Sequence, residues 1–321
     1  MAEITASAVK ALREQTGLPM MDCKKALQEA GGDLEAAVVW LRKQGKKVAE
    51  KRSGRSTTSG RIAVYTDLAG GVGTMVDLRC ESAPVANNDQ FIGLANDLAL
   101  QLATGPGAAD PAALLAQPSP SQAGHTLGQQ FEDLNNRIRE AFNLARIVRI
   151  DGPCAGYAHH NGAVGVLLEV ENGQPELARD ICMHIAAMRP LVLRREELDA
   201  ALVAKERELI DQVITKEVDG VLAEANRVLA LPDETIQDPH NLEKTVSSHV
   251  RARGDLHKAE GMKKNKAKVI DGRLGMFYVE RCLLEQPHAN QAKYEGKTIR
   301  DLAAKAGMKI VRFVHWELPK E

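Results

Sequence analysis

Aromatic residues are scarce in this chain of 321 residues, which has five Phe, four Tyr and two Trp, together 3% of the sequence. Its core must therefore be built mainly from Leu, Val, Ile and Ala, which favours helices with some strand. The 42 basic and 43 acidic residues leave a net charge of -1, so the chain lacks the basic excess typical of a general nucleic-acid-binding domain. With 44% hydrophobic and 26% charged residues, the composition excludes a wholly disordered chain.

Long apolar runs are also missing. No window approaches the roughly 20 apolar residues that a membrane-spanning helix needs. The first residues lack the charged segment and apolar run of a secretory signal. The five cysteines lie far apart without a C-x-x-C pair, which argues against a disulfide framework or a zinc site. We therefore expect a cytoplasmic protein with reduced thiols and no metal or other cofactor.

The first 48 residues predict three short helices. Thr5 and Asp33 are candidate N-caps, and Gly17, Gly31 and Gly45 are candidate stops. Each helix is too short to be stable alone, so we expect the three to pack as a small module.

A basic stretch follows this module. Residues 42–55 contain seven Lys or Arg and one acidic residue, and residues 50–60 are rich in Ser, Thr and Gly. The composition predicts a solvated linker or a frayed helix end. A nucleic-acid patch is the alternative, but no aromatic side chains are interleaved to stack on bases.

The core is expected to contain two β-hairpins, each followed by an amphipathic helix. The first hairpin covers residues 61–80, and the second covers residues 157–170 around Asn161-Gly162, a strong short-range hairpin signal. The second unit is expected to open with a further strand over residues 143–151. The order of strand, strand and helix recurs, which indicates two similar α+β subdomains related by a weak internal duplication.

The C-terminal third is expected to be largely helical. Residues 194–231 predict a long helix, and residues 241–268 are polar with few large apolar side chains, which indicates a helical excursion outside the core. A last strand is expected over residues 308–316. The chain then divides into a three-helix module, a basic linker, two core subdomains, a helical protrusion, and a C-terminal helix and strand that return to the core: 1–48, 49–60, 61–142, 143–195, 196–268 and 269–321.

Several sequence blocks resemble one family. The segment Met20-Met-Asp-Cys-Lys-Lys-Ala-Leu27 resembles the N-terminal module of the bacterial translation elongation factor Ts family. Later blocks agree, and the resemblance covers nearly the whole chain except residues 104–124 and 205–265. These blocks are residues 76–80, Tyr157-Ala-His159 with residues 165–167, and residues 272–274, 277–278 and 283–287.

The resemblance implies an α+β fold, with an N-terminal three-helix ubiquitin-associated-like module and a core of two similar α+β subdomains with a helical protrusion. It implies a guanine-nucleotide exchange factor that binds elongation factor Tu, both GDP-bound and nucleotide-free, and promotes GDP release by displacing the elements that hold magnesium and phosphate. Such a factor does no covalent chemistry and is not an enzyme, because it acts only by binding one state better than another. Neither membrane nor direct nucleic-acid binding is expected. This chain has no Gly-x-x-x-x-Gly-Lys-Ser/Thr nucleotide-binding loop of its own.

The resemblance also implies which side chains meet the partner. From the residues alone, one of the two neighbouring methionines is better interpreted as bundle core. A metal site at the histidine pair of the second hairpin is disfavoured, because no acidic or cysteine partner lies at ligand spacing. The implied partner-binding residues are Lys10, Arg13, Met20, Met21, Ser82, Ala83, Pro84, Val85 and His159.

One stretch among these residues departs from the family. The family carries Thr-Asp-Phe-Val after the first hairpin, where the Asp and Phe press against the partner near its magnesium site. This chain has Ser82-Ala83-Pro84-Val85, and a proline buries much less than the roughly 150 Å² of a phenylalanine. If Ser82 caps a helix with Pro84 in its first turn, the loop still presents an apolar bump and exchange is retained, which we expect. The alternative is a Tu-binding protein with weakened exchange.

Two other classes of protein are alternatives to an exchange factor. A cysteine enzyme needs a nearby base, but Cys182 and His184 are two residues apart on a helix and do not face each other. An RNA-binding or ubiquitin-like binding module remains the other alternative, because three-helix modules bind partner helices and the basic stretch offers cations for RNA.

Overall fold

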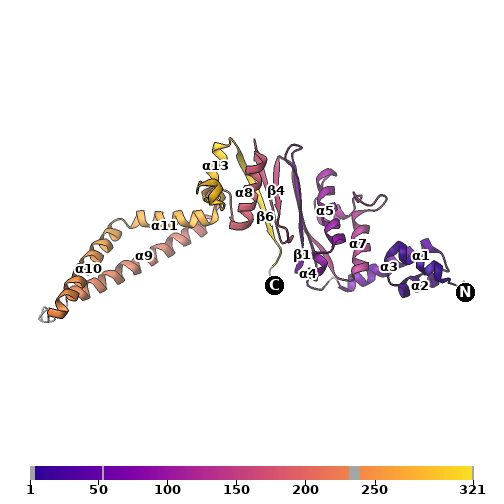
Figure 1. The fold of residues 1–321 in the computed structure, drawn as a ribbon, viewed down its shortest axis with the longest axis horizontal. Helices are drawn as coiled ribbons and strands as arrows, with labels where there is room; N and C mark the ends of the chain where they lie inside the picture. Colours follow the sequence, from indigo (N-terminus) through magenta and orange to yellow (C-terminus); the bar gives the residue numbers. More distant parts are fainter. Residues whose placement is uncertain (1–3, 53, 231–238, 320–321) are drawn as a thin grey trace. The chain divides into compact units, whose positions relative to one another are not determined.

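The computed structural model describes residues 4–52, 54–230 and 239–319, which form helices and two small antiparallel sheets (Figure 1). The chain folds as two compact units, each described here by itself. The first comprises Met1–Arg189, Ala292–Tyr294 and Asp301–Glu321, and the second Pro190–Gln291 and Glu295–Arg300.

The N-terminal helices form where the sequence predicts them. Thr5 Oγ1 accepts a hydrogen bond from the Ala8 N–H at 3.3 Å, and Asp33 Oδ1 accepts one from the Glu35 N–H at 2.8 Å, so both N-caps are confirmed. Gly17 ends the first helix in the left-handed conformation, at φ 68°. The three helices are α1 (Ala6–Thr16), α2 (Met20–Glu29) and α3 (Leu34–Arg52).

The third helix does not end at Gly45 as predicted, but continues to Arg52. A Cβ atom at Gly45 would lie 2.1 Å from the side-chain amide nitrogen of Asn136 on helix α7 (Leu127–Ile138). The glycine therefore allows α3 and α7 to approach closely and does not mark a helix end. The first residues of the expected linker are helical as a result.

The first sheet follows the predicted hairpin. Strands β1 (Ser59–Asp67) and β2 (Val72–Cys80) pair antiparallel, and β3 (Phe142–Ile150) pairs with the other edge of β2. We expected the strand at 143–151 to open the second subdomain, and this grouping is wrong. Strand β2 pairs with β1 along one edge and with β3 along the opposite edge, which gives the order β1-β2-β3 and makes β3 part of the first sheet.

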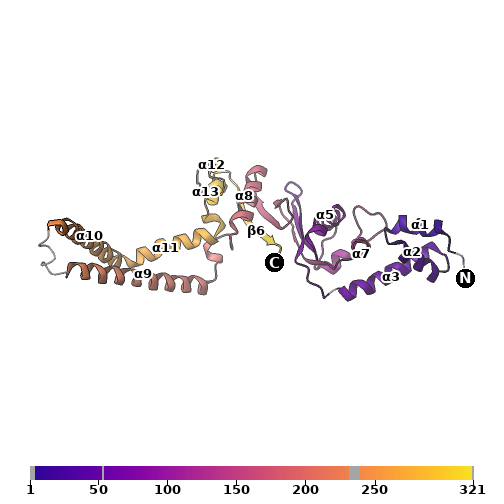
Figure 2. The same ribbon diagram turned by 60° about the horizontal axis from the view of Figure 1, so that its bottom comes forward.

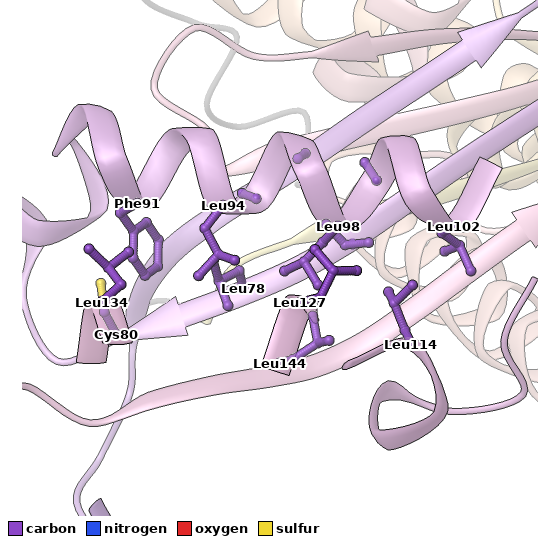
Figure 3. Packing of buried hydrophobic residues seen from close by; sticks show 14 of the residues in the cluster. Leu78, Cys80, Phe91, Leu94, Leu98, Leu102, Leu114, Leu127, Leu134 and Leu144 are labelled. Carbon is purple, nitrogen blue, oxygen red and sulfur yellow. The ribbon is translucent and has the colours of Figure 1, made fainter. Parts of the chain in front are cut away.

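Helices cover one face of this sheet. The apolar stripe of α5 (Asp89–Thr104) faces β2, with Phe91 packed beside Cys80 and Leu94 above Leu78 (Figure 3). Leucines from the neighbouring helices and from β3 complete this core. The other covering helices are α4 (Ala83–Ala86), α6 (Pro111–Leu115) and α7.

The second sheet has the order β4-β5-β6. Strands β4 (Cys154–Ala158) and β5 (Val164–Glu171) form the expected hairpin, and the C-terminal strand β6 (Lys309–Glu317) pairs with β5. Helix α8 (Pro175–Met188) packs on β4 and β5 and ends with Arg189 as its C-cap, because Arg189 precedes a proline. The fold is thus mixed α+β, with N-terminal helices followed by two small antiparallel sheets and their helices.

Glycines let the two sheets pack face to face. A Cβ atom at Gly165 on β5 would lie 2.4 Å from Ile62 Cγ2 and 2.7 Å from Met75 Sδ, both in the first sheet. A Cβ atom at Gly73 on β2 would lie 2.5 Å from Cys154 Cβ on β4. Even a methyl side chain has no room at either position, so glycine at Gly73 and Gly165 allows the two sheets to lie this close together.

The second unit is mainly helical (Figure 2). Its long helices are α9 (Ala200–Leu229), α10 (Pro239–Lys264) and α11 (Lys266–Arg281), which pack together through Ile214, Ala259 and Leu274. Two 3-10 turns lie at Arg195–Glu197 and Leu283–Glu285. Part of the predicted helix 194–231 and of the stretch before residue 241 lies outside the described residues. None of the helices in the described ranges could cross a membrane. Two short helices precede β6: α12 (Gln291–Tyr294) and α13 (Ile299–Lys305).

Replacing glycine by alanine should change the free energy of unfolding in opposite directions at a position between the sheets and at an open position on a helix. Gly165→Ala should lower the free energy of unfolding by about 1–3 kcal/mol, because Ile62 and Met75 are fixed in the core. Gly93→Ala in α5, where a Cβ atom meets nothing within 4 Å, should raise it by up to about 1 kcal/mol. Urea denaturation followed by circular dichroism measures both, and equal effects would contradict the packing described.

Candidate functional site

Both methionines of the N-terminal module are exposed. Met20 is 49% exposed and Met21 is 72% exposed, so the interpretation that one of them belongs to the bundle core is wrong. Helix α2 buries Cys23, Ala26 and Leu27 instead, and the two methionines stand in its first turn outside that stripe. A pair of exposed thioether side chains is an adaptable apolar contact surface.

Two cations stand on the preceding helix. Lys10 and Arg13 are exposed and three residues apart on α1, so they lie on the same face, while Val9 and Leu12 are buried. Lys10 Nζ lies 3.9 Å from a carboxylate oxygen of Glu14, and both side chains are mostly exposed. Such a pair contributes little to stability, which leaves the cation accessible to a partner.

The segment Ser82–Val85 begins the four-residue helix α4. Ala83 and Pro84 are exposed, and Val85 packs on the core beneath them. Ser82 has the extended backbone of an N-cap, but its side chain makes no capping bond. Its hydroxyl instead donates to Glu140 Oε1 at 2.6 Å, so the prediction that Ser82 caps the helix holds for position and not for bonding.

Two carboxylates hold this segment in place. Glu140 Oε2 accepts the backbone N–H of Ser82 at 3.1 Å. Glu81 Oε1 accepts the backbone N–H of Ala141 at 2.6 Å and lies 3.2 Å from a guanidinium nitrogen of Arg55. The backbone bond from Ala141 and the bond from Arg55 hold the pKa of Glu81 below its usual value.

His159 lies in the turn between β4 and β5. Its Nδ1 is 2.9 Å from Asn161 Oδ1, and the same oxygen accepts the Ala163 N–H at 2.9 Å, so the turn is internally bonded. The rings of His159 and His160 lie 4.2 Å apart. Among the residues that the structure describes, no group of three His, Cys, Asp or Glu is arranged to hold a metal ion.

The histidine turn and the segment Ser82–Val85 lie at the same end of the two sheets. The first residue of β1, Ser59, pairs with Cys80 at the end of β2. Three residues further along β1, the Ile62 N–H donates to the Gly162 carbonyl at 2.7 Å, inside the turn that carries His159. The first residues of β1 therefore connect the two loops.

The methionine pair is joined to the same region. Asp22, next to Met21, accepts a hydrogen bond from Arg139 at 2.5 Å. Arg139 directly precedes Glu140, which bonds Ser82. The structure thus connects the module, the Ser82–Val85 segment and the histidine turn on one unit, whereas Lys10 and Arg13 have no described contact with the core.

Sequence reasoning missed the residues that make these connections. Asp22, Glu81, Arg139 and Glu140 were not among the implied partner-binding residues. Their bonds span 58 to 117 positions along the chain, so local spacing carries no signal for them. The one local signal was Glu81, an acidic residue directly after strand β2, which indicates that the segment following this strand is polar.

The cysteines are not arranged for nucleophilic chemistry. All five are buried. Burial raises the pKa of Cys80 and of Cys154 to about 12, and it also raises the pKa of Cys182. These groups therefore stay as thiols near neutral pH, and a thiol is a poor nucleophile.

Comparison with known proteins identifies similar chains. The family model described as elongation factor TS matches residues 81–320. The elongation factor Ts of Methylococcus capsulatus is 35% identical over 318 residues, which cover 98% of this chain and 92% of that protein. The elongation factor Ts of Saccharopolyspora erythraea is 33% identical over 323 residues, 99% of each chain. That of Magnetococcus marinus is 33% identical over 326 residues, 98% of this chain and 92% of that protein.

The lowered pKa of Glu81 predicts a pH-dependent contribution to stability. Its carboxylate stabilises the fold above the unfolded-state pKa of about 4.3, and this contribution is lost as the pH falls through the lower pKa of the folded state. Glu81→Gln should therefore cost roughly 1 kcal/mol of unfolding free energy at pH 7, and the difference from wild type should shrink in acid.

Urea denaturation at a series of pH values measures this difference. Glu14→Gln is the matched control, because that carboxylate is exposed and makes only a 3.9 Å ion pair, and its effect should stay small at every pH. A Glu81→Gln deficit that grows toward acid would contradict the assignment.

Proposed function

The chain belongs to the elongation factor Ts family, and we propose that it is a guanine-nucleotide exchange factor that binds GDP-loaded elongation factor Tu and promotes GDP release in translation elongation. The family resemblance inferred from the sequence blocks is confirmed by the comparisons, which extend over almost the full chain. Members of this family are exchange factors and not enzymes. We place the protein in the cytoplasm on the same family grounds.

The observation that best supports this proposal is the grouping of the family's contact positions. Seven of the nine residues that the resemblance assigns to the partner come from α2, from the segment after β2 and from the turn between β4 and β5. The other two, Lys10 and Arg13, lie on α1. Hydrogen bonds from Arg139, Ser82 and Ile62 connect these three elements. These bonds link the three elements within one compact unit, which supports a partner that contacts more than one of them.

Exchange by such a surface needs no chemical step. A GTPase holds GDP through a phosphate-binding loop and magnesium, so a factor promotes release by binding more tightly to the state in which those elements have moved. The exposed Ala83 and Pro84 carry no charge and act by occupying volume. Met20 and Met21 supply the adaptable apolar contact, and the cations on α1 supply complementary charge.

A second candidate is binding with weakened exchange. The family's Asp and Phe are replaced here by Ala83 and Pro84, and this replacement removes the acid and most of the apolar area at the loop. The structure keeps the loop exposed and held, which supports retained exchange.

RNA binding has less support. Arg42 of the basic stretch lies 3.3 Å from Asp133, and Arg55 lies 3.2 Å from Glu81. Two cations of that stretch are therefore paired within the protein.

The exchange proposal predicts faster loss of fluorescent GDP from the cognate elongation factor Tu. Adding the chain should weaken GDP binding by roughly tenfold or more and speed release accordingly. Stopped-flow fluorescence measures the rate, and gel filtration detects the complex. A complex without faster release would instead establish the weakened-exchange alternative, and a dominant RNA partner with steep salt dependence would overturn both.

The methionine pair should contribute to affinity without contributing to stability. The double variant Met20→Ala with Met21→Ala should weaken the complex by about tenfold, since truncating apolar side chains at an interface costs on the order of 1 kcal/mol or more. Its thermal unfolding should match wild type, because both side chains are exposed. Met276→Ala, at a residue 68% exposed on α11, is the matched control and should change neither quantity. Unchanged binding by the double variant would remove these residues from the interface.

A further inference from the structure

We propose that Glu140 is a positioning residue for exchange, which acts by holding Ser82 so that Ala83 and Pro84 meet the partner at a fixed place. This inference rests on the proposed exchange function and deepens it. The carboxylate of Glu140 acts on the segment through Ser82, with which both of its oxygens form hydrogen bonds.

The bonding of Ser82 carries the inference. Both oxygens of Glu140 are used on this one residue, Oε1 by the hydroxyl at 2.6 Å and Oε2 by the backbone N–H at 3.1 Å. The Ser82 carbonyl accepts from the Cys80 thiol at 3.3 Å and from the Ala86 N–H at 3.2 Å. Two parallel bonds to one carboxylate fix orientation as well as position, and bonds to a charged acceptor are the stronger kind.

The local chain cannot supply this order by itself. Helix α4 has only four residues, and a helix of one turn is not stable in isolation. Ser82 stands at its N-cap position but does not bond the free N–H groups of the first turn. The placement of Ala83 and Pro84 therefore depends on what holds Ser82, and Glu140 reaches it from the turn between α7 and β3, 58 positions away.

The function of the loop makes this order matter. An uncharged tip displaces its partner's elements only if it stays in place when they press against it. A loop that moves instead spends binding energy on its own ordering, and the part of the binding energy that distinguishes the two partner states falls. The module and the histidine turn still bind, so the loss should be in release rate and not in affinity.

The test measures fluorescent GDP release from elongation factor Tu over a range of concentrations of the full chain. Glu140→Ala should lower the maximal release rate by about tenfold, as expected for losing hydrogen bonds to a charged acceptor, with the half-saturating concentration changed by less than about twofold. Glu140→Gln keeps an acceptor for the Ser82 N–H, and its amide donates to the rotated hydroxyl, so the rate should be largely restored.

Two further variants separate positioning from general stability. Ser82→Ala should lower the maximal rate by about threefold alone and have no further effect in the Glu140→Ala background, because both act through one contact. Asp110→Ala removes the N-cap of α6, where Oδ1 accepts the Ala113 N–H at 2.8 Å, and should cost stability without lowering the release rate.

The outcomes are distinct. An unchanged maximal rate for Glu140→Ala, a change in affinity only, or additive effects of the Ser82 and Glu140 variants overturns the inference while the exchange function stands. No acceleration by the wild-type chain overturns the proposed function and the inference with it. If Glu140→Ala does not fold, Ser82→Ala decides, and a wild-type rate for that variant overturns the inference.

Discussion

Three consecutive residues at the end of α7 set the geometry of the candidate site. Arg139 ends the helix in the left-handed conformation, at φ 66°, which turns the chain sharply into β3. Arg139 bonds Asp22 in the module, Glu140 bonds Ser82 after β2, and the Ala141 N–H bonds Glu81. This one turn of the backbone thus bonds both helix α2 and the segment after β2, which are distant in the sequence. The positions of Met20 and Met21 and of the segment Ser82–Val85 both depend on it.

The core between the two sheets is built from small and medium-sized side chains. Few aromatic residues are available to fill it, and Gly73 and Gly165 let the two sheets come close enough for medium-sized side chains to fill the remaining space. Because β1 belongs to this tightly packed pair and bonds the histidine turn through Ile62, the turn is held by the core and not by its own residues alone. The close packing of the two sheets therefore also fixes the position of the turn that carries His159.

Local signals in the sequence predicted the helices and strands well, but they did not predict contacts between residues that are distant in the sequence. Thr5 and Asp33 were recognisable as caps because a cap depends on residues two or three positions away. Gly45 was misread as a helix end because the space it provides is occupied by Asn136, which no local pattern connects to it. The pairing of β3 and the bond between Glu140 and Ser82 are non-local in the same way. At the site, the family resemblance supplied candidate residues, and the structure supplied what holds them.

The departure from the family at Ala83 and Pro84 is best understood through rigidity. A phenylalanine offers a large apolar surface but must lose side-chain freedom to press against a partner, whereas a proline offers little area on a backbone whose φ is already fixed. Ser82 is held by two bonds to one carboxylate, so under the proposed function the backbone at Ala83 and Pro84 is what the partner would meet. If exchange proceeds as proposed, the contribution of this segment depends more on how rigidly Ser82 holds it than on the size of the side chain at position 84.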